Sequence, residues 1–307
     1  IGFAKENNLF IYDIASEKIT QVTTDGKKNC IINGITDWVY EEEFAFVRAY
    51  DWSADSKKLA YIRFDESQVP EFSMTIFQKE LYPKMETFKY PKAGEDNAKV
   101  SLHTYNLKTR KSKKIALGSY EYIPRIQWSN TNPILIATNL NRHQNDLKLH
   151  KVNVLKSRST LLLNEKDDAY VSVKNDLTFL EDNSFIWTSE RDGWNHIYHF
   201  NKSGDLKNQI TQGAWEVTNY YGYDPKSNTV FYQSTENGSI NRGVYSINAN
   251  GENKKELSVA TGTNSAAFSA DYSYYINTYQ SATTPSVFTL RDAKTAAVLK
   301  QLKDNTD

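Results

Sequence analysis

Short stretches in which hydrophobic and polar residues alternate run along almost the whole chain, and the spacing of an amphipathic helix is nearly absent. Alternation with a period of two is typical of half-buried β-strands. Turn residues such as Ser203, Gly204 and Asp205 separate these stretches. The pattern therefore predicts an all-β fold.

One unit recurs along the chain: an aromatic residue, a polar turn and then a hydrophobic strand. Its aromatic positions are Trp52, Trp128, Phe179, Tyr223 and Phe268. The last three intervals between them approach about 40–45 residues, which is the period of four-stranded propeller blades. The sequence thus predicts a β-propeller of four-stranded antiparallel blades, built as one domain over residues 1–307.

The repeat divides the chain into five complete blades and part of another. The complete blades are expected at 48–118, 121–164, 170–213, 216–258 and 263–305. Residues 1–23 look like the second half of an earlier blade. Because propellers usually have four to eight blades, we expect an incomplete ring whose first and last strands expose unpaired edges.

The first complete blade carries an insertion at about 65–99 that interrupts the repeat. It contains Pro70, Pro83 and Pro91 together with alternating apolar residues. This pattern favours an extended two-stranded arm over a helix. A long mobile loop is the alternative.

One segment departs from the strand pattern. Asp37 is a preferred N-cap residue, and Tyr40 and Phe44 would share a helical face because they are four residues apart. We therefore expect a short helix within 34–47, with Trp38, Tyr40 and Phe44 forming an aromatic frame.

Three adjacent carboxylates occupy this predicted helix: Glu41, Glu42 and Glu43. Neighbouring side chains lie about 100° apart in a helical turn and can converge on one small group, whereas in a strand they point to opposite faces. Two carboxylates near one ammonium group would contribute roughly 4 kcal/mol each before desolvation, at an effective dielectric constant of about 20. We expect the aromatic frame to bury the carboxylates; a solvated acidic surface helix is the alternative.

Composition limits the function classes. The 307 residues are 39% hydrophobic and 24% charged, and no apolar run reaches the roughly 18 residues that a membrane span needs. Lys and Arg total 37, as do Asp and Glu, so we expect no nucleic-acid partner and no anionic-membrane footprint. Cys30 is the single cysteine, which excludes an internal disulfide and a multi-cysteine metal site.

The chain lacks a complete catalytic constellation. No two of the thirteen glycines are four residues apart, so the nucleophile elbow Gly-x-Ser-x-Gly is absent. His196 and His199 would face opposite sides of a strand, which argues against a zinc pair. His103, His143 and His150 are isolated. We therefore expect no catalytic residue, no metal and no cofactor in this chain.

Four segments carry a resemblance to a known family, in the family's order and at similar spacing: Gly34–Glu43, Tyr90–Gly94, Ser189–Tyr198 and Gly213–Val217. They resemble the propeller region of dipeptidyl peptidase IV, a serine exopeptidase of the prolyl oligopeptidase type. The resemblance covers nearly the whole chain but only the non-catalytic part of such an enzyme. It implies a bacterial-type member that is truncated at both ends.

The resemblance implies roles for the acidic segment. Glu42 and Glu43 would bind the α-ammonium group of a peptide and so measure two residues to the scissile bond, while Glu41 serves the helix. The parent protein would release Xaa-Pro or Xaa-Ala dipeptides from free N-termini. Its Ser, Asp and His triad is expected on an α/β-hydrolase domain beyond Asp307, so this chain alone should be inactive.

The resemblance also implies an eight-bladed propeller, of which this chain would hold about five and a half blades. It implies a homodimer that uses the arm at 65–99, and a location in the periplasm, the cell envelope or outside the cell. Tyr170–Val173 aligns with a pocket aromatic residue and a second arginine, but Val171 and Ser172 depart from that pattern. From the residues alone, a non-enzymatic propeller scaffold for a protein partner remains an alternative.

Overall fold

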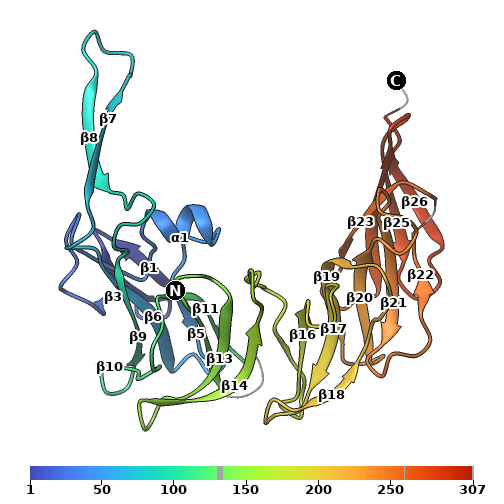
Figure 1. Ribbon diagram of the computed structural model, residues 1–307, viewed down its shortest axis with the longest axis horizontal. Coiled ribbons are helices and arrows are strands. Elements are labelled where there is room, and N and C mark those ends of the chain that lie inside the picture. Colours follow the sequence, from blue (N-terminus) through green and yellow to red (C-terminus); the bar gives the residue numbers. More distant parts are fainter. Residues whose placement is uncertain (130–133, 259, 306–307) are drawn as a thin grey trace. The chain divides into compact units, whose positions relative to one another are not determined.

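A computed structural model describes residues 1–129, 134–258 and 260–305 (Figure 1). The described residues form antiparallel sheets and one short helix, which confirms the predicted all-β class. They fall into two compact units that divide between Val173 and Lys174, where the sequence analysis expected one domain.

The first unit contains the helix and the longer run of strands. Its elements are β1 (Gly2–Lys5), β2 (Asn8–Asp13), β3 (Lys18–Gln21), β4 (Ile31–Asn33), α1 (Trp38–Glu43), β5 (Tyr50–Trp52), β6 (Lys58–Asp65), β7 (Glu71–Ile76), β8 (Lys84–Lys89), β9 (Lys99–Asn106), β10 (Lys111–Lys114), β11 (Tyr122–Trp128), β12 (Leu135–Leu140), β13 (Asp146–Asn153) and β14 (Arg158–Lys166).

The sheets of this unit are mostly meanders, in which each strand pairs with the next. Strands β1 to β3 form one sheet and β11 to β14 another, while the sheet between them in sequence has the order β10-β9-β6-β4 with β5 also on β6. Residues 1–23 therefore supply three strands, where half a blade was expected. The expected blade at 48–118 gains a fifth strand, β4, because Ile31–Asn33 pairs with residues 63–65.

The second unit repeats one four-stranded antiparallel meander three times. Its strands are β15 (Thr178–Phe179), β16 (Phe185–Ser189), β17 (His196–Phe200), β18 (Leu206–Gln209), β19 (Val217–Asp224), β20 (Thr229–Ser234), β21 (Gly243–Asn248), β22 (Lys255–Glu256), β23 (Thr263–Phe268), β24 (Tyr274–Ser281), β25 (Thr284–Asp292) and β26 (Val298–Lys303). Four-stranded meanders of this kind are the blades of propellers.

The recurring aromatic residues lie at the ends of the first strands. Trp52, Trp128, Phe179 and Phe268 are the last residues of β5, β11, β15 and β23, and Tyr223 is the penultimate residue of β19. Buried side chains such as Ile186, Val230 and Tyr232 form the core between neighbouring sheets of the second unit.

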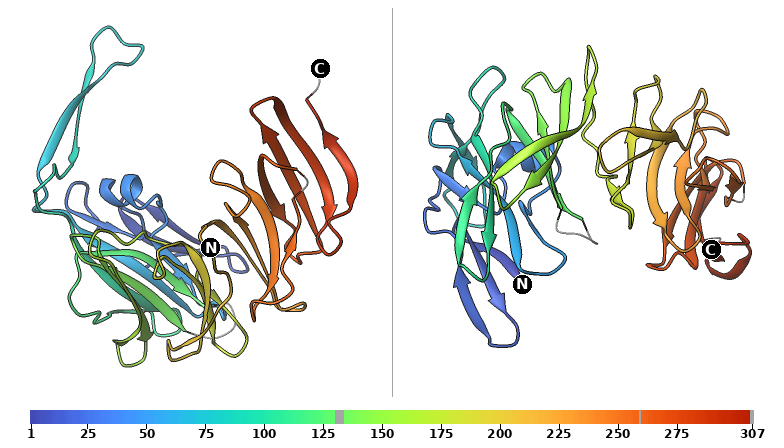
Figure 2. Two further views of the ribbon diagram at one scale, coloured as in Figure 1. Left: turned by 45° about the vertical axis from the view of Figure 1, so that its right-hand side comes forward. Right: turned by 90° about the horizontal axis from the view of Figure 1, so that it is seen from below.

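The insertion at 65–99 contains a two-stranded hairpin, which we call the arm (β7 and β8). Its strands pair from Glu71 with Lys89 to Ile76 with Lys84. Figure 2 shows the arm extending away from the sheets of its own unit. The side chains of Phe77, Leu81 and Tyr82 near its tip are more than three-quarters exposed.

Helix α1 leaves the sheet between β4 and β5, which both pair with β6. Three backbone hydrogen bonds close the base of this excursion, which spans residues 34–49. The N–H of Ala49 donates to the carbonyl of Gly34 at 3.0 Å, that of Gly34 to Ile62 at 3.1 Å, and that of Ile62 to Ala49 at 2.9 Å. These bonds hold the two ends of the excursion together against β6; we call them the closed base of the helix.

Glycine is required at the start of the excursion. Gly34 has a positive φ of 74°, and a Cβ atom there would come within 2.8 Å of the Cδ1 atom of Leu9. L-residues with side chains rarely adopt this conformation, and the contact adds a clash.

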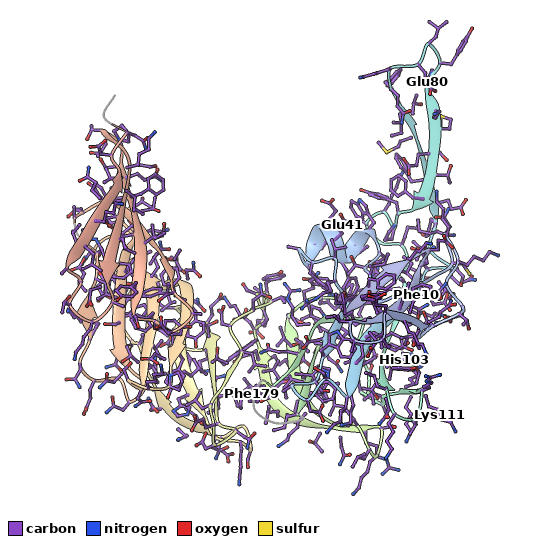
Figure 3. The ribbon with its side chains drawn as sticks, turned by 180° about the vertical axis from the view of Figure 1, so that it is seen from behind. Phe10, Glu41, Glu80, His103, Lys111 and Phe179 are labelled. Carbon is purple, nitrogen blue, oxygen red and sulfur yellow. The ribbon has the colours of Figure 1, made fainter. Side chains whose placement is uncertain are left out.

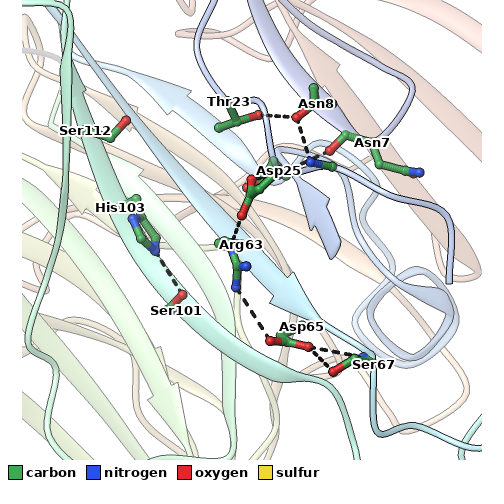
Figure 4. A network of polar contacts seen from close by, with 12 residues as sticks. Asn7, Asn8, Thr23, Asp25, Arg63, Asp65, Ser67, Ser101, His103 and Ser112 are labelled. Carbon is green, nitrogen blue, oxygen red and sulfur yellow. Dashed lines mark hydrogen bonds and ion pairs between the residues drawn. The ribbon is translucent and has the colours of Figure 1, made fainter. Parts of the chain in front are cut away.

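A polar network joins the connection between β3 and β4 to β6 (Figure 4). The Nε atom of Arg63 donates to Asp25 at 2.8 Å, and its Nη1 atom lies 3.9 Å from a carboxylate oxygen of Asp65. The side-chain amide of Asn33 donates to the other carboxylate oxygen of Asp25 at 2.9 Å. Arg63 beside Asp25 lowers the pKa of this carboxyl group, although partial burial opposes the effect. The network fixes the strand from which the excursion begins.

Candidate functional site

Helix α1 begins at the residue that its sequence predicted. Asp37 is the N-cap, and its carboxylate accepts a hydrogen bond of 3.0 Å from the backbone N–H of Tyr40. This bond satisfies one of the N–H groups that a helix leaves unpaired in its first turn. The expected short helix is therefore confirmed, at Trp38–Glu43.

Tyr40 attaches the helix to the core. Its side chain is 2% exposed, and its ring packs against Phe44 and Phe64 at centroid distances of 5.0 and 4.8 Å. Its hydroxyl oxygen accepts a hydrogen bond of 2.8 Å from the backbone N–H of Ile123 in β11. Helix α1 is thus tied to two different sheets.

The C-terminal end of the helix is stabilised by an arginine from β11. An Nη atom of Arg125 donates to the carbonyl oxygen of Phe44 at 2.7 Å, and the guanidinium group lies 5.0 Å from the centre of the Phe46 ring. Ala45 adopts a positive φ of 55°, which ends the helix. Sequence reasoning missed Arg125, because the contact joins residues 81 positions apart.

The expectation that an aromatic frame buries the three carboxylates is wrong. All of Glu41, Glu42 and Glu43 are exposed, whereas Tyr40 and Phe44 lie in the core beneath them. A surface helix buries one face only, and Tyr40 and Phe44 occupy the buried face of α1. The carboxylates therefore meet solvent on the outer side of α1, where Figure 3 shows Glu41.

Glu43 lines a hollow of about 780 Å³ between α1 and the base of the arm. Other lining residues come from α1, the arm, the segment after it, the start of β11 and the turn after β12: Trp38, Phe72, Phe88, Tyr90, Tyr122 and Arg142. Glu42 is absent from this lining among the described residues. The two glutamates that sequence reasoning paired thus have different surroundings.

The aromatic wall of this hollow couples the helix to the arm. The rings of Trp38 and Tyr90 have centroids 4.2 Å apart, and Phe72 lies 5.5 Å from Tyr90. Trp38 is half-buried by these contacts. It therefore supports α1 from the side of the arm and does not cover the glutamates.

Arg142 supplies a positive charge to the same hollow. Its guanidinium group contacts Glu121 at 3.2 Å and donates to the carbonyl oxygen of Glu95 at 2.5 Å. The amide of Asn97 donates both to Glu121, at 2.8 Å, and to the hydroxyl of Tyr122, at 2.9 Å. Burial raises the pKa of Tyr122, and the charges of Glu121 and Glu43 add to the effect. This polar side of the hollow was missed from the sequence.

Tyr170–Val173 lies next to the hollow. The backbone N–H of Val171 donates to the carbonyl of Gln144 at 2.8 Å, and the Tyr170 hydroxyl donates to the Gln144 side chain at 3.3 Å. Gln144 itself lines the hollow. The segment therefore adds an aromatic residue, 53% exposed, and no arginine.

A second carboxyl group is buried near the beginning of α1. Asp37 is 7% exposed and Glu66, just before the arm, is 6% exposed. Burial raises the pKa of Asp37 to about 6, although the N–H of Tyr40 opposes the shift. Burial also raises the pKa of Glu66 to about 7, with a further increase from the charge of Asp37 and a decrease from Lys89. Both groups therefore titrate near neutral pH.

His196 and His199 make structural contacts. His196 bonds through Nδ1 to the Thr211 hydroxyl and through Nε2 to the Gly213 carbonyl, each at 3.0 Å. His199 contacts the Ser184 hydroxyl at 2.9 Å. In the described residues, no three His, Cys, Asp or Glu side chains are grouped as metal ligands. No helix there is both long and apolar enough to cross a membrane.

Comparison with known proteins agrees with the fold. The family model for the dipeptidyl peptidase IV N-terminal region matches residues 1–286. A probable dipeptidyl-aminopeptidase B of Pyrenophora teres f. teres is 31% identical over 91% of this chain and 34% of its own length. A probable dipeptidyl peptidase 4 of Aspergillus flavus is 29% identical over 99% of this chain and 43% of its own length.

Solved structures extend the comparison. The crystal structure of Porphyromonas gingivalis dipeptidyl peptidase 4 has a TM-score of 0.94 and 45% identity, covering 99% of this chain and 44% of that one. That of a putative dipeptidyl aminopeptidase IV from Bacteroides ovatus has a TM-score of 0.81 and 25% identity, covering 99% and 45%. This chain thus spans less than half the length of these relatives. It belongs to the family of dipeptidyl peptidase IV N-terminal regions.

Proposed function

We propose that this chain is the substrate-anchoring propeller region of a serine dipeptidyl peptidase. In this proposal Glu42 and Glu43 bind the free α-ammonium group of a peptide. The parent enzyme then releases Xaa-Pro or Xaa-Ala dipeptides from the peptide's N-terminus. Family membership and the likeness to a crystallised dipeptidyl peptidase 4 support the assignment.

The observation that carries the proposal is the fixed position of two adjacent carboxylates on α1. Asp37 caps the beginning of the helix, Arg125 contacts its end, and Tyr40 fastens its inner face to β11. A helix held at three points presents its glutamates with little freedom of the backbone. Such positioning contributes to catalysis by holding the scissile bond at a constant distance from the anchor.

The exposure of the glutamates limits what they can do alone. Exposed ion pairs contribute about 0.2–1 kcal/mol each, so this surface on its own would bind a peptide N-terminus weakly. A surface that excludes water from the helix strengthens the pairs, because the effective dielectric constant falls. We propose that a C-terminal α/β-hydrolase domain of the same polypeptide supplies this cover together with the Ser-Asp-His triad.

The arm is proposed to join two copies of the protein. Large apolar side chains that are 80–89% exposed lie near its tip, at Phe77, Leu81 and Tyr82. Removing such side chains from water in a dimer is favourable by about 25 cal/mol per Å² of apolar surface. By the same family relationship, we propose a location in the periplasm, the cell envelope or outside the cell.

The anchor is tested by changing the glutamates in the full-length protein, one at a time, to glutamine. We expect Glu42→Gln and Glu43→Gln each to lower kcat/KM on a Gly-Pro chromogenic substrate by more than about tenfold, which is 1.4 kcal/mol. Glu41→Gln is the matched control, since it removes an equal charge from the same helix, and it should retain most activity.

Two outcomes contradict the proposal. If neither Glu42→Gln nor Glu43→Gln changes the kinetics, the carboxylates do not anchor the substrate. If the unchanged full-length protein releases no dipeptide from any Xaa-Pro or Xaa-Ala peptide, the chain serves instead as a non-enzymatic scaffold.

A further inference from the structure

Two stretches of the first unit contain no acidic residue. The first is 97–120, and its cations are Lys99, Lys108, Arg110, Lys111, Lys113 and Lys114. The second is 147–164, and its cations are Lys148, Lys151, Lys156 and Arg158. In a chain whose charges balance, this separation concentrates positive charge locally.

The two stretches lie side by side in the structure. The N–H of Ala116 donates to the carbonyl of Ser157 at 3.1 Å, and the hydroxyl of Ser159 donates to the carbonyl of Ala116 at 2.8 Å. Ala116 and Arg158 also form a parallel bridge. These bonds join the segment just after β10 to the start of β14 and the turn before it. The cations near this junction therefore lie close together, although they come from two segments.

Most of these cations are exposed and have no acidic partner within 4.0 Å among the described residues. This holds for a set that we call the basic face: Lys108, Arg110, Lys111, Lys113, Lys156 and Arg158. Lys114 is left out because it points to the other side of β10 from Lys113. Unpaired like charges repel one another, so gathering them is unfavourable unless an anion approaches.

Protection of an edge strand explains only part of this pattern. Lysines on exposed edge strands prevent pairing with other chains, and β10 is an edge strand. However, the edge strands β18 and β22 do not show the same excess. Lys207 in β18 lies 4.0 Å from Asp182, and Lys255 in β22 is followed by Glu256.

An apolar feature lies within the basic face. A hollow of about 410 Å³ is lined by Tyr105 and Leu155 and bordered by Lys58, Lys111 and Lys113. Leu155 lies in the turn before β14, directly before Lys156, and is 80% exposed. An exposed leucine surrounded by cations is the arrangement of proteins that lie on anionic lipid surfaces.

We propose that the basic face docks this protein onto an anionic lipid bilayer, with Leu155 entering the interfacial layer. Equal totals of acidic and basic residues had suggested that no such surface exists, and the local distribution revises that expectation. Residues 107–116 and 153–159 contain no aromatic side chain, and Tyr105 in the hollow is only 4% exposed. Binding of single-stranded nucleic acid relies on aromatic stacking among the cations, so a lipid surface fits better.

The position of the face is compatible with peptide access to α1. Within the first unit, Figure 1 shows β10 at the end opposite to α1 and the arm. Figure 3 shows Lys111 at that end, while Glu41 and Glu80 lie toward the other. A bilayer that contacts the basic face would therefore leave the anchor helix directed away from the lipid.

The test is co-sedimentation of the full-length protein with vesicles. We expect it to sediment with vesicles of phosphatidylcholine mixed with phosphatidylglycerol and to stay in solution with phosphatidylcholine alone. Binding should weaken as salt rises from about 0.1 to 1 M, because the Debye length falls from about 10 to 3 Å. The double variant Lys111→Glu/Lys113→Glu should bind the anionic vesicles at least about tenfold more weakly.

Matched variants make the result specific. Lys300→Glu/Lys303→Glu changes the net charge equally on β26, whose residues are exposed, and should bind within about twofold of the unchanged protein. Leu155→Ser keeps every charge and should weaken vesicle binding several-fold. If the Lys111→Glu/Lys113→Glu variant does not fold, Lys111→Gln/Lys113→Gln replaces it. We then expect a smaller but measurable loss of vesicle binding.

Three results would overturn the proposal. The first is equal binding to both kinds of vesicle, and the second is an equal loss in the β10 and β26 variants. The third is binding to a short DNA duplex that matches binding to the anionic vesicles, together with no effect of Leu155→Ser. That third outcome would assign the basic face to a nucleic acid.

Discussion

The hydroxyl of Tyr40 accepts a hydrogen bond from the backbone N–H of Ile123, at 2.8 Å, across 83 residues of sequence. Both residues are buried, and Ile123 is fully inaccessible to solvent. A side chain of the acidic helix thus completes the hydrogen bonding of a strand in a different sheet. Helix α1 consequently depends on the correct placement of β11.

Tyr40→Phe should therefore destabilise the protein. The substitution keeps the ring contacts but leaves the Ile123 N–H buried without its partner, which costs about 1–3 kcal/mol. Urea unfolding monitored by fluorescence measures the loss. Tyr170→Phe is the control, because it removes a hydroxyl from a side chain that is 53% exposed, and it should change stability by less than about 0.5 kcal/mol. Equal effects of the two substitutions would show that the buried bond is unimportant.

Stability should depend on pH through Asp37. Burial raises the pKa of this group from 3.8 to about 6, so between these values the folded state binds a proton that the unfolded chain releases. The free energy of unfolding therefore falls as pH rises through about 4 to 6, and Glu66 extends the fall toward about 7.

Asp37→Asn tests this dependence. The amide oxygen can still accept from the Tyr40 N–H, but the group no longer titrates, so the fall in stability with pH should become shallower. Urea unfolding at several pH values gives the slope. Asp168→Asn, at an exposed position, should leave the slope unchanged. An unaltered slope in Asp37→Asn would assign the pH dependence to other groups.

Tyr90→Ala should disturb the anchor through Trp38. It removes a ring whose centroid is 4.2 Å from that of Trp38, and such pairs contribute about 0.5–1.5 kcal/mol beyond burial. In the full-length enzyme we expect KM for a Gly-Pro substrate to rise about three- to tenfold, with a smaller change in kcat. Tyr82→Ala, at the exposed arm tip, is the control for an aromatic loss. An unchanged KM in Tyr90→Ala would show that the contact between Tyr90 and Trp38 does not affect the proposed anchor.

The arm tip should determine the oligomeric state. Leu81→Asp places a charge on a side chain that is 89% exposed, and burying that charge in a dimer would be strongly unfavourable. Analytical ultracentrifugation should then show monomers, whereas the proposed role of the arm predicts dimers of the unchanged protein. Ile240→Asp, at an equally exposed position of the second unit, should leave the dimer intact. A monomeric unchanged protein, or a dimeric Leu81→Asp variant, would refute the role of the arm.

The sequence predicted those features that depend on residues close together in the chain, such as the short helix. The cap at Asp37 and the shared face of Tyr40 and Phe44 act within one helical turn, and both appear in the structure. The recurring aromatic residues were expected only to mark the repeat, and in the structure they lie at or next to the ends of the first strands. The same local geometry should have excluded burial of Glu41 to Glu43, because one helix cannot bury Tyr40, Phe44 and every residue between them.

The remaining features arise from contacts that are distant in sequence. Arg125 reaches the end of α1 from another sheet, and Arg142 meets Glu95 across 47 residues. Strand β4 contains only three residues, so its alternation is too short to detect. The charge of Glu66 matters because folding brings it near Asp37. A single sequence contains the residues for these contacts but no signal of their pairing.

The closed base at Gly34, Ala49 and Ile62 holds the registers of β4 and β5, which each pair with β6 independently of the helix. The exposed residues Glu41, Glu42 and Glu43 make no part of that base, whereas Tyr40 and Phe44 lie in the core. Evolution could therefore change the outward side of α1 while the surrounding strands stay unchanged. For an engineer, this side can be redesigned as long as the two buried aromatic residues are kept.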